Sequence, residues 1–278
     1  VRIKKPVLIV LGEPNSVFIE ILAKALNKNS IKKKINYPII IIGSKNLLIS
    51  QLKRLKKKIS FKLFEDNKFE NKKLLNKIYL IDINYKFKKP FESISKKSKK
   101  YISKCFEKGL NFLNSGISDI IVNGPVSKAH FLQNKYPGVT EYIFNKSKNK
   151  LIKNPVMLIF NKKLSVSPIT THVPLKNVNK KINEKIIINN TLTVHNFYKK
   201  KIKIKPKIAV LGLNPHCETK SKLNEEKKII KPAITKLNKK KINVSGPFSA
   251  DTFFLKKNIS KYDSVIGMYH DQILTPFK

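Results

Sequence analysis

The stretch Pro38-Ile39-Ile40-Ile41-Ile42-Gly43 holds four consecutive β-branched residues between a proline and a glycine. β-Branched residues favour strands, and a run without polar alternation is typical of a strand that is buried on both faces. Such strands occur mainly in parallel sheets that helices cover on both sides. The stretch therefore predicts a covered parallel sheet if similar runs alternate with helices along the chain.

Similar apolar runs do recur. They occupy 6–11, 78–83 and 119–122 in the first half, and 156–160, 164–170, 207–211, 242–244 and 263–268 in the second. Between them lie stretches with helical spacing, at 19–26, 47–55, 93–114, 177–198 and 225–237. This alternation indicates an α/β fold with mostly parallel sheets covered by helices.

The charge of the chain is extreme. Its 278 residues include 59 basic and 17 acidic side chains, so the formal net charge is +42, a feature of many nucleic-acid-binding proteins. However, Arg2 and Arg54 are the only arginines, and the lysines are spread along the sequence. Recognition of phosphates and bases favours the planar guanidinium of arginine. We therefore interpret the charge as a solvated lysine surface rather than a nucleic-acid site.

The cysteine content and the apolar runs bear on the cellular compartment. Cys105 and Cys217 are the only cysteines, so no disulfide framework is predicted, which fits a reducing cytosol. The first residues lead into a short strand-like run rather than a signal-peptide core. No apolar run approaches the length of a membrane span. The sequence therefore predicts a cytoplasmic protein.

Three of the five histidines, His172, His216 and His270, lie in polar clusters that follow strand-like runs. The other two, His130 and His195, lie in stretches that favour helix. Neutral imidazole is the commonest protein ligand of divalent transition metals, so three imidazoles at strand ends can form one metal site. They could equally be three unrelated loop histidines, because no short metal-binding spacing is present.

Six segments carry a resemblance to a known family. They lie at 12–14, 123–128, 140–141, 171–175, 212–216, and 246–254 with 262–272. The most specific are Leu-Asn-Pro-His at 213–216 and Met-Tyr-His-Asp-Gln at 268–272. In order and spacing, the six resemble the metal-dependent 4-hydroxythreonine-4-phosphate dehydrogenases of pyridoxal phosphate biosynthesis, over essentially the whole chain.

The resemblance implies the two-domain fold of isocitrate and isopropylmalate dehydrogenases. It suggests a first α/β domain at 1–125 and a second, with the metal histidines, at 126–278. It further implies a homodimer with its active site at the subunit interface. In this arrangement His172, His216 and His270 bind a divalent metal, and one of the three is donated by the partner subunit.

The resemblance also assigns roles to four other positions. Asp251 and Lys278 are expected to be catalytic residues, with Asp251 near the metal. Thr140 and Lys278 are expected to contact the substrate, the lysine at its phosphate or carboxylate. Val139 occupies a substrate-binding position where the family usually has a histidine, and its apolar side chain cannot donate a hydrogen bond.

The implied activity is the oxidation and decarboxylation of a phosphorylated small molecule, 4-phosphohydroxy-L-threonine, with NAD or NADP. The divalent metal would act as a Lewis acid, and zinc, cobalt, manganese and magnesium are all compatible with the predicted ligands. The family normally continues for several dozen residues beyond the position of Lys278. That segment supplies two substrate-binding groups and completes the first domain, so we expect the 278-residue chain to have little activity.

Two alternatives remain open at this stage. One is a related dehydrogenase that acts on a phosphorylated four-carbon sugar acid or a cis-diol carboxylate, and Val139 favours it. The other is a non-catalytic lysine-rich protein that binds nucleic acid with a steep salt dependence.

Overall fold

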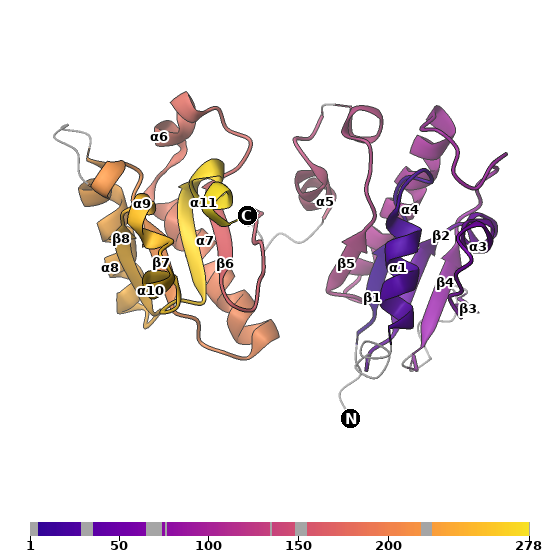
Figure 1. The fold of residues 1–278 in the computed structure, drawn as a ribbon, viewed down its shortest axis with the longest axis horizontal. Helices are drawn as coiled ribbons and strands as arrows, with labels where there is room; N and C mark the ends of the chain where they lie inside the picture. The colour runs from indigo at the N-terminus through magenta and orange to yellow at the C-terminus, as the bar shows by residue number, and fades with distance from the viewer. Residues whose placement is uncertain are drawn as a thin grey trace. The chain divides into compact units, whose positions relative to one another are not determined.

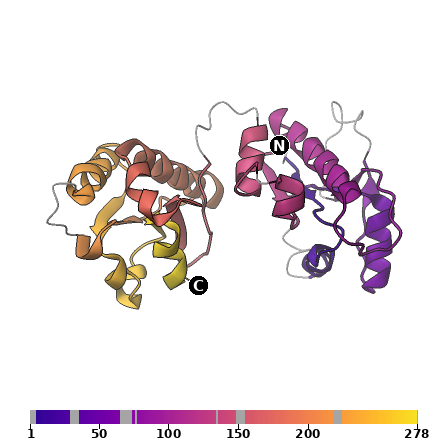
Figure 2. The same cartoon turned by 90° about the horizontal axis from the view of Figure 1, so that it is seen from above.

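The computed structural model describes residues 5–28, 36–64, 74–75, 77–133, 135–147, 155–217 and 224–277. The chain divides into two compact units, Val1–Lys153 and Asn154–Lys278, and each is considered by itself. Figures 1 and 2 show a sheet flanked by helices in each unit. The predicted α/β fold with parallel, covered sheets is therefore confirmed.

The first unit contains a five-stranded sheet with the order β3-β4-β2-β1-β5, in which every pair of neighbours is parallel. The strands are β1 (Val7–Val10), β2 (Ile39–Gly43), β3 (Lys62–Leu63), β4 (Ile78–Asp82) and β5 (Ile120–Asn123). Residues of β2 alternate between two cores: Ile40 and Ile42 belong to one, and Ile39 and Ile41 to the other. The isoleucine run is thus buried on both faces, as predicted.

Helices cover both faces of this sheet. They are α1 (Phe18–Asn27), α3 (Lys45–Arg54), α4 (Lys96–Asn114), the π-helix η2 (Lys128–Leu132) and α5 (Val139–Lys146). Helix α4 begins at Lys96 rather than at the predicted residue 93, because Ser95 and Ser98 form a reciprocal capping box at its start. The expectation that His130 lies in a helix is confirmed by η2.

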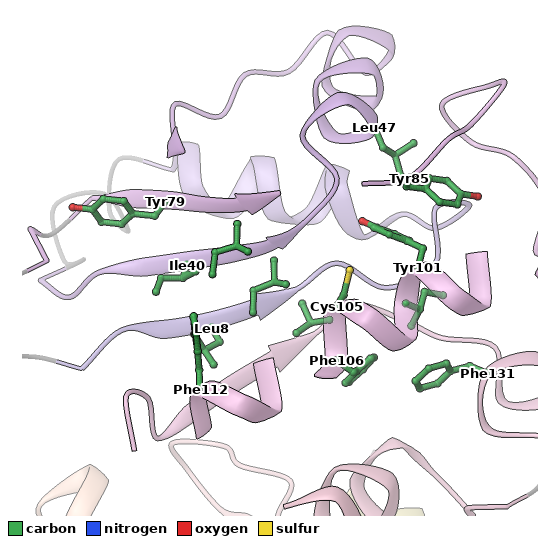
Figure 3. Close-up of a cluster of buried hydrophobic side chains, with 14 of the residues drawn as sticks. Leu8, Ile40, Leu47, Tyr79, Tyr85, Tyr101, Cys105, Phe106, Phe112 and Phe131 are labelled. Atoms are coloured by element: carbon green, nitrogen blue, oxygen red, sulfur yellow. The ribbon is translucent and has the colours of Figure 1, made fainter. Parts of the chain in front are cut away.

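The boundary between the units falls later than the predicted boundary at 125/126. Phe131 stacks on Phe106 of α4 with ring centroids 5.2 Å apart, and Tyr142 meets the same Phe106 ring edge-on at 5.5 Å. Figure 3 shows Phe131 beside Phe106 in the core that also contains Leu8 and Ile40. Aromatic packing therefore joins the segment after β5 to the first unit.

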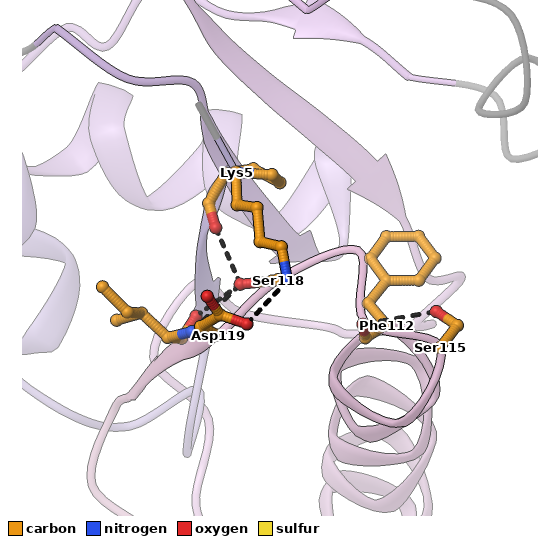
Figure 4. A network of polar contacts seen from close by, with 7 residues as sticks. Lys5, Phe112, Ser115, Ser118 and Asp119 are labelled. Atoms are coloured by element: carbon orange, nitrogen blue, oxygen red, sulfur yellow. Dashed lines mark hydrogen bonds and ion pairs between the residues drawn. The ribbon is translucent and has the colours of Figure 1, made fainter. Parts of the chain in front are cut away.

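Polar contacts fix the start of β5 against the start of β1 (Figure 4). The Ser118 hydroxyl donates to the Pro6 carbonyl oxygen at 2.7 Å, and the exposed Lys5 ammonium lies 2.9 Å from Asp119 Oδ1. β5 is an edge strand of the sheet, and its Ile120 and Val122 side chains are exposed.

The second unit contains a four-stranded parallel sheet with the order β6-β9-β7-β8. The strands are β6 (Ser165–Thr170), β7 (Ile208–Leu211), β8 (Val244–Phe248) and β9 (Ser264–Tyr269). The prediction of a strand at 156–160 is wrong, since this segment forms only an isolated antiparallel bridge between Ile159 and Val166. The strand predicted at 242–244 begins two residues later and extends to Phe248.

The longer helices of the second unit are α7 (Glu184–Phe197), α8 (Lys231–Lys239) and α11 (His270–Phe277). Shorter helical segments are η3 (Leu175–Asn177), α6 (Val178–Lys181), η4 (Tyr198–Ile202), η5 (Pro215–Cys217), η6 (Glu226–Ile230), α9 (Ala250–Phe253) and α10 (Lys256–Ile259). The helix predicted at 177–198 is interrupted, because Asn183 accepts a hydrogen bond from the Ile186 N–H and starts a new helix.

Residues of α7 and α8 share a core with one face of this sheet, while residues of α9 and α11 share a core with the other. Within the described residues, no helix is both long enough and apolar enough to cross a membrane.

Candidate metal centre

The carboxyl ends of the four strands of the second unit carry the candidate ligands in a continuous row. His172 follows β6, His270 follows β9, His216 follows β7, and Asp251 follows β8. Because the sheet order is β6-β9-β7-β8 and all pairs are parallel, these four side chains belong to neighbouring strand ends at one edge. In parallel sheets, ligands bind beyond this edge.

The backbone is unusual at two of the three histidines. His172 has φ +50° and His216 has φ +54°, and Cys217 continues in the same left-handed region with φ +57°. The other described non-glycine residues with positive φ directly follow helical segments, or nearly so, where this conformation is common. Left-handed residues in other loops cost free energy and concentrate at functional sites. The conformation therefore favours a functional role for both histidine loops.

Carboxylates flank one ring nitrogen of two histidines. His270 Nδ1 lies 2.8 Å from Asp271 Oδ1, and His216 Nδ1 lies 3.5 Å from Asp251 Oδ2. A carboxylate that accepts from Nδ1–H fixes the tautomer in which Nε2 carries the free lone pair. This is the arrangement that carboxylates adopt beside metal-binding histidines. Imidazole rings with such carboxylate partners are the type of ligand that divalent transition metals take in proteins.

Asp251, which was expected to lie near the metal, has its Oδ2 3.5 Å from Nδ1 of the candidate ligand His216. Its Oδ1 accepts a hydrogen bond from the Ser249 hydroxyl at 2.6 Å. This hydrogen bond lowers the pKa of the Asp251 carboxyl, and His216 contributes a smaller lowering. The side chain is exposed, so it can accept a further partner at the sheet edge.

Buried polar side chains to which the sequence analysis assigned no role hold the backbone near the candidate ligands. Gln272 donates from Nε2 to the Gly212 carbonyl oxygen at 2.6 Å and accepts from the Met268 N–H at 2.7 Å. Thr170 donates from Oγ1 to the Met268 carbonyl oxygen at 2.8 Å. Glu226 is fully buried and accepts from the N–H groups that follow Gly212.

Within the described ranges, the row is not assembled into a metal site. Among the residues that the structure describes, no three His, Cys, Asp or Glu side chains form a group that could hold a metal ion. Val139 and Thr140 lie in the first turn of α5, in the first unit, where Val139 packs against the core and Thr140 is exposed. Lys278 lies outside the described residues.

The first unit has a polar group of its own at the carboxyl end of β1. Glu13 is 6% exposed, and its Oε2 has no hydrogen-bond partner among the described residues. Burial raises the pKa of the Glu13 carboxyl, and a hydrogen bond from the Ser127 N–H lowers it by less. Glu13, Gln51 and Tyr101 line a cavity with room for about one water molecule, judged by its volume of about 10 Å³.

The fold defines a two-unit α/β protein with a row of histidines at the carboxyl ends of one parallel sheet. Residues 34–278 match the family described as pyridoxal phosphate biosynthetic protein PdxA. The chain belongs to the PdxA family, and the resemblance drawn from the six sequence segments is confirmed.

Individual relatives agree with this assignment. The chain is 36% identical over 274 residues to 4-hydroxythreonine-4-phosphate dehydrogenase of Sulfurihydrogenibium sp. (strain YO3AOP1), covering 97% of this chain and 81% of that protein. It is 32% identical to the enzyme of the same name from Aquifex aeolicus (strain VF5), covering 99% and 82%.

Solved structures give the same result. The crystal structure of a 4-hydroxythreonine-4-phosphate dehydrogenase from Burkholderia phymatum matches with a TM-score of 0.78 at 25% identity, covering 99% of this chain and 83% of that chain. A terephthalate 1,2-cis-dihydrodiol dehydrogenase from Burkholderia xenovorans LB400 shares the fold, with a TM-score of 0.67 at 18% identity, covering 98% of this chain and 82% of that chain.

Proposed function

We propose that the protein is a 4-hydroxythreonine-4-phosphate dehydrogenase. It would oxidise the hydroxyl carbon of 4-phosphohydroxy-L-threonine with NAD or NADP as the hydride acceptor, and the resulting β-keto acid would lose carbon dioxide. Family membership supports the activity. The structural observation that carries the proposal is the row of three histidines and Asp251 on the neighbouring strand ends of one parallel sheet.

In this proposal, His172, His216 and His270 are the ligands of a divalent metal. Asp271 and Asp251 each lie beside an Nδ1 atom, at His270 and His216 respectively, and would orient these two rings so that Nε2 faces the ion. When bound, the ion supplies Lewis-acid polarisation of the substrate oxygens. Imidazole ligands favour zinc or cobalt, while oxygen ligands from the substrate also suit manganese or magnesium.

Two further residues are proposed to contact the substrate. Thr140 is exposed in the first turn of α5 and is proposed to donate its hydroxyl to the substrate. Lys278 is proposed to bind the phosphate or carboxylate, for which an ammonium is a suitable point charge. The net charge of +42 would favour the approach of such an anionic substrate.

The proposed assembly is a homodimer in which one metal histidine comes from the partner subunit. The resemblance motivates this assembly, and the exposure of the His216 side chain, at 77%, leaves that ring accessible to groups of a second chain. Light scattering at micromolar concentration should give twice the mass of one chain. A single-chain mass at all concentrations would contradict the dimer.

One observation keeps a second substrate under consideration. Val139 is apolar and packs against the core of the first unit, so it cannot replace a phosphate-binding histidine. The related substrates are a phosphorylated four-carbon sugar acid and a cis-diol carboxylate, and the second has no phosphate, so its dehydrogenase would need fewer donors at this position. Faster NADH formation from one of these than from 4-phosphohydroxy-L-threonine would favour this second function.

The decisive experiment combines metal analysis with activity. His216→Ala should lose most of the bound metal after dialysis and should form no NADH from 4-phosphohydroxy-L-threonine. His130→Ala is the matched control, because His130 is an exposed histidine of the first unit and should leave the metal content unchanged. Equal metal content in His216→Ala and in the unsubstituted protein would contradict the proposed ligands.

A further inference from the structure

One buried carboxylate, that of Glu226, accepts hydrogen bonds from the loop that carries His216. Glu226 Oε1 lies 2.8 Å from both the Leu213 and the Asn214 backbone nitrogens, and Oε2 lies 3.0 Å from Asn214 Nδ2. Burial alone would raise the pKa of Glu226, but these donors, together with the backbone N–H of Glu226 itself, outweigh it and hold the pKa below its usual value. The carboxylate therefore binds the loop as an anion with three donors, the strongest type of hydrogen bond available to it.

The same loop is also hydrogen-bonded to α11, the helix that begins at His270, through Gln272. Gln272 lies two residues after His270 and is 9% exposed. Its Nε2 donates to the Gly212 carbonyl oxygen at 2.6 Å, and its Oε1 accepts from the Met268 N–H at 2.7 Å. A single side chain thus satisfies a backbone group before each of two candidate ligands, His216 and His270.

The absence of a side chain at Gly212 makes this close packing feasible. A Cβ atom built on Gly212 would lie 2.6 Å from Cys217 Sγ and 3.2 Å from Glu226 Oε1. Both distances are shorter than ordinary van der Waals contact. The lack of a side chain at Gly212 therefore allows Glu226 and Gln272 both to form hydrogen bonds with the backbone of residues 212–214.

We propose that Gln272 and Glu226 are positioning residues, which fix the His216 segment relative to the strand that carries His270 before any metal binds. The inference rests on the proposed metal ligands. Without the hydrogen bonds of Gln272 and Glu226, the metal would have to order a loop with two consecutive left-handed residues, His216 and Cys217. Preorganisation of ligands by such buried partners typically changes metal affinity by about 10- to 100-fold.

The test measures Co²⁺ binding by calorimetry and by the visible absorption of the bound ion, so that it does not depend on activity. Gln272→Met keeps the volume but removes both hydrogen bonds. Glu226→Gln keeps the shape but turns an amide NH₂ towards donors. Each variant should bind Co²⁺ roughly tenfold more weakly, with an altered absorption spectrum that reports a changed ligand geometry.

Val194→Ala is the control for a general loss of stability. Val194 is buried in α7, one turn before Tyr198, whose hydroxyl lies 2.8 Å from Ser165 Oγ at the amino end of the sheet. This variant should lower the unfolding midpoint but leave Co²⁺ affinity within about twofold, because it does not alter the ligand edge.

A milder third variant covers the case in which a buried change prevents folding. Asn214→Ala removes the amide contacts but keeps both backbone bonds to Glu226, and it should weaken Co²⁺ binding about threefold. Full affinity with an unchanged spectrum in every variant that folds would overturn the inference. His216→Ala in the same titration separates the two proposals: if it binds Co²⁺ normally, the proposed ligand set fails as well.

Discussion

Asp271 Oδ1 lies 2.8 Å from His270 Nδ1, on the residue that directly follows the histidine in the chain. His270 directly follows β9 and is the first residue of α11, so the Asp271 carboxylate lies in the first turn of that helix. The contact leaves Nε2 as the nitrogen available to a ligand. An acidic residue next to a candidate ligand thereby fixes the ring without help from a distant element.

Replacement of this carboxylate should weaken metal binding without removing it. Asp271→Ala is expected to lower the affinity for Zn²⁺ or Co²⁺ about tenfold, because the imidazole loses its orienting acceptor. Calorimetric titration of the dialysed protein measures this change. Asp119→Ala is the matched control, since it removes an exposed carboxylate of the first unit that pairs with Lys5. Equal losses in both variants would indicate a general charge effect and contradict the orienting role.

The opposite end of the same sheet offers a change that affects stability alone. The Tyr198 hydroxyl lies 2.8 Å from both Ser165 Oγ and the Asp263 carbonyl oxygen, at the amino ends of β6 and β9. Tyr198→Phe should lower the free energy of unfolding of the second unit by about 1 kcal/mol, the typical contribution of one hydrogen bond. Urea unfolding measures it. Metal affinity should stay constant, and an unchanged urea midpoint would show that the contact is not stabilising.

His195 should make the second unit less stable in mild acid. It is 8% exposed, its Nδ1 has no partner among the described residues, and burial, followed by Lys199 and Lys205, lowers its pKa from 6.5. The unfolded chain therefore binds a proton at a higher pH than the folded chain. Stability is retained above about pH 6.5 and falls as the pH drops towards the folded pKa.

The measurement is urea unfolding between pH 7.5 and pH 5. His195→Gln cannot be protonated in this range, so its stability should fall less steeply than that of the unsubstituted protein. Parallel curves for the two proteins would show that His195 is not responsible for the pH dependence.

The sequence was a sufficient guide where the burial pattern of a segment decides its structure. The isoleucine run at 39–42 became β2 because an uninterrupted apolar strand is stable only between two covered faces. The run at 156–160 is also apolar throughout, yet Ile159 pairs only with Val166, in an isolated bridge. Periodicity does not reveal whether a neighbouring strand will supply hydrogen-bond partners.

The candidate site divides in the same way. The three candidate histidines could be predicted because they follow strands, and the carboxyl ends of parallel strands lie at one end of the sheet. Asp251 was expected near the metal only because its segment resembles the family. Gln272 and Glu226 were not assigned a role, because their partners are tertiary. Gln272 meets Gly212 sixty residues earlier, and no local pattern indicates that contact.

Glu13 should destabilise the first unit at neutral pH. Burial raises its pKa from 4.5 despite the weak hydrogen bond from the Ser127 N–H at 3.5 Å, and Oε2 has no hydrogen-bond partner in the part of the chain that the structure describes. A group whose pKa is raised by folding contributes stability only below its unfolded pKa, and that stability is lost as the pH rises through the folded value.

Glu13→Gln removes the ionisation, so the first unit of this variant should unfold at a higher temperature at pH 7 than that of the unsubstituted protein. The difference should disappear near pH 3, which lies below the unfolded pKa of about 4.3 and the raised folded pKa, so that Glu13 is protonated in both states. Thermal unfolding at both pH values measures it, and a lower unfolding temperature for Glu13→Gln at pH 7 would show that the carboxylate is stabilised by its surroundings. Because Glu13 lies at the carboxyl end of β1, where parallel sheets bind ligands, retention of a destabilising carboxylate there is expected of a functional group rather than a structural one.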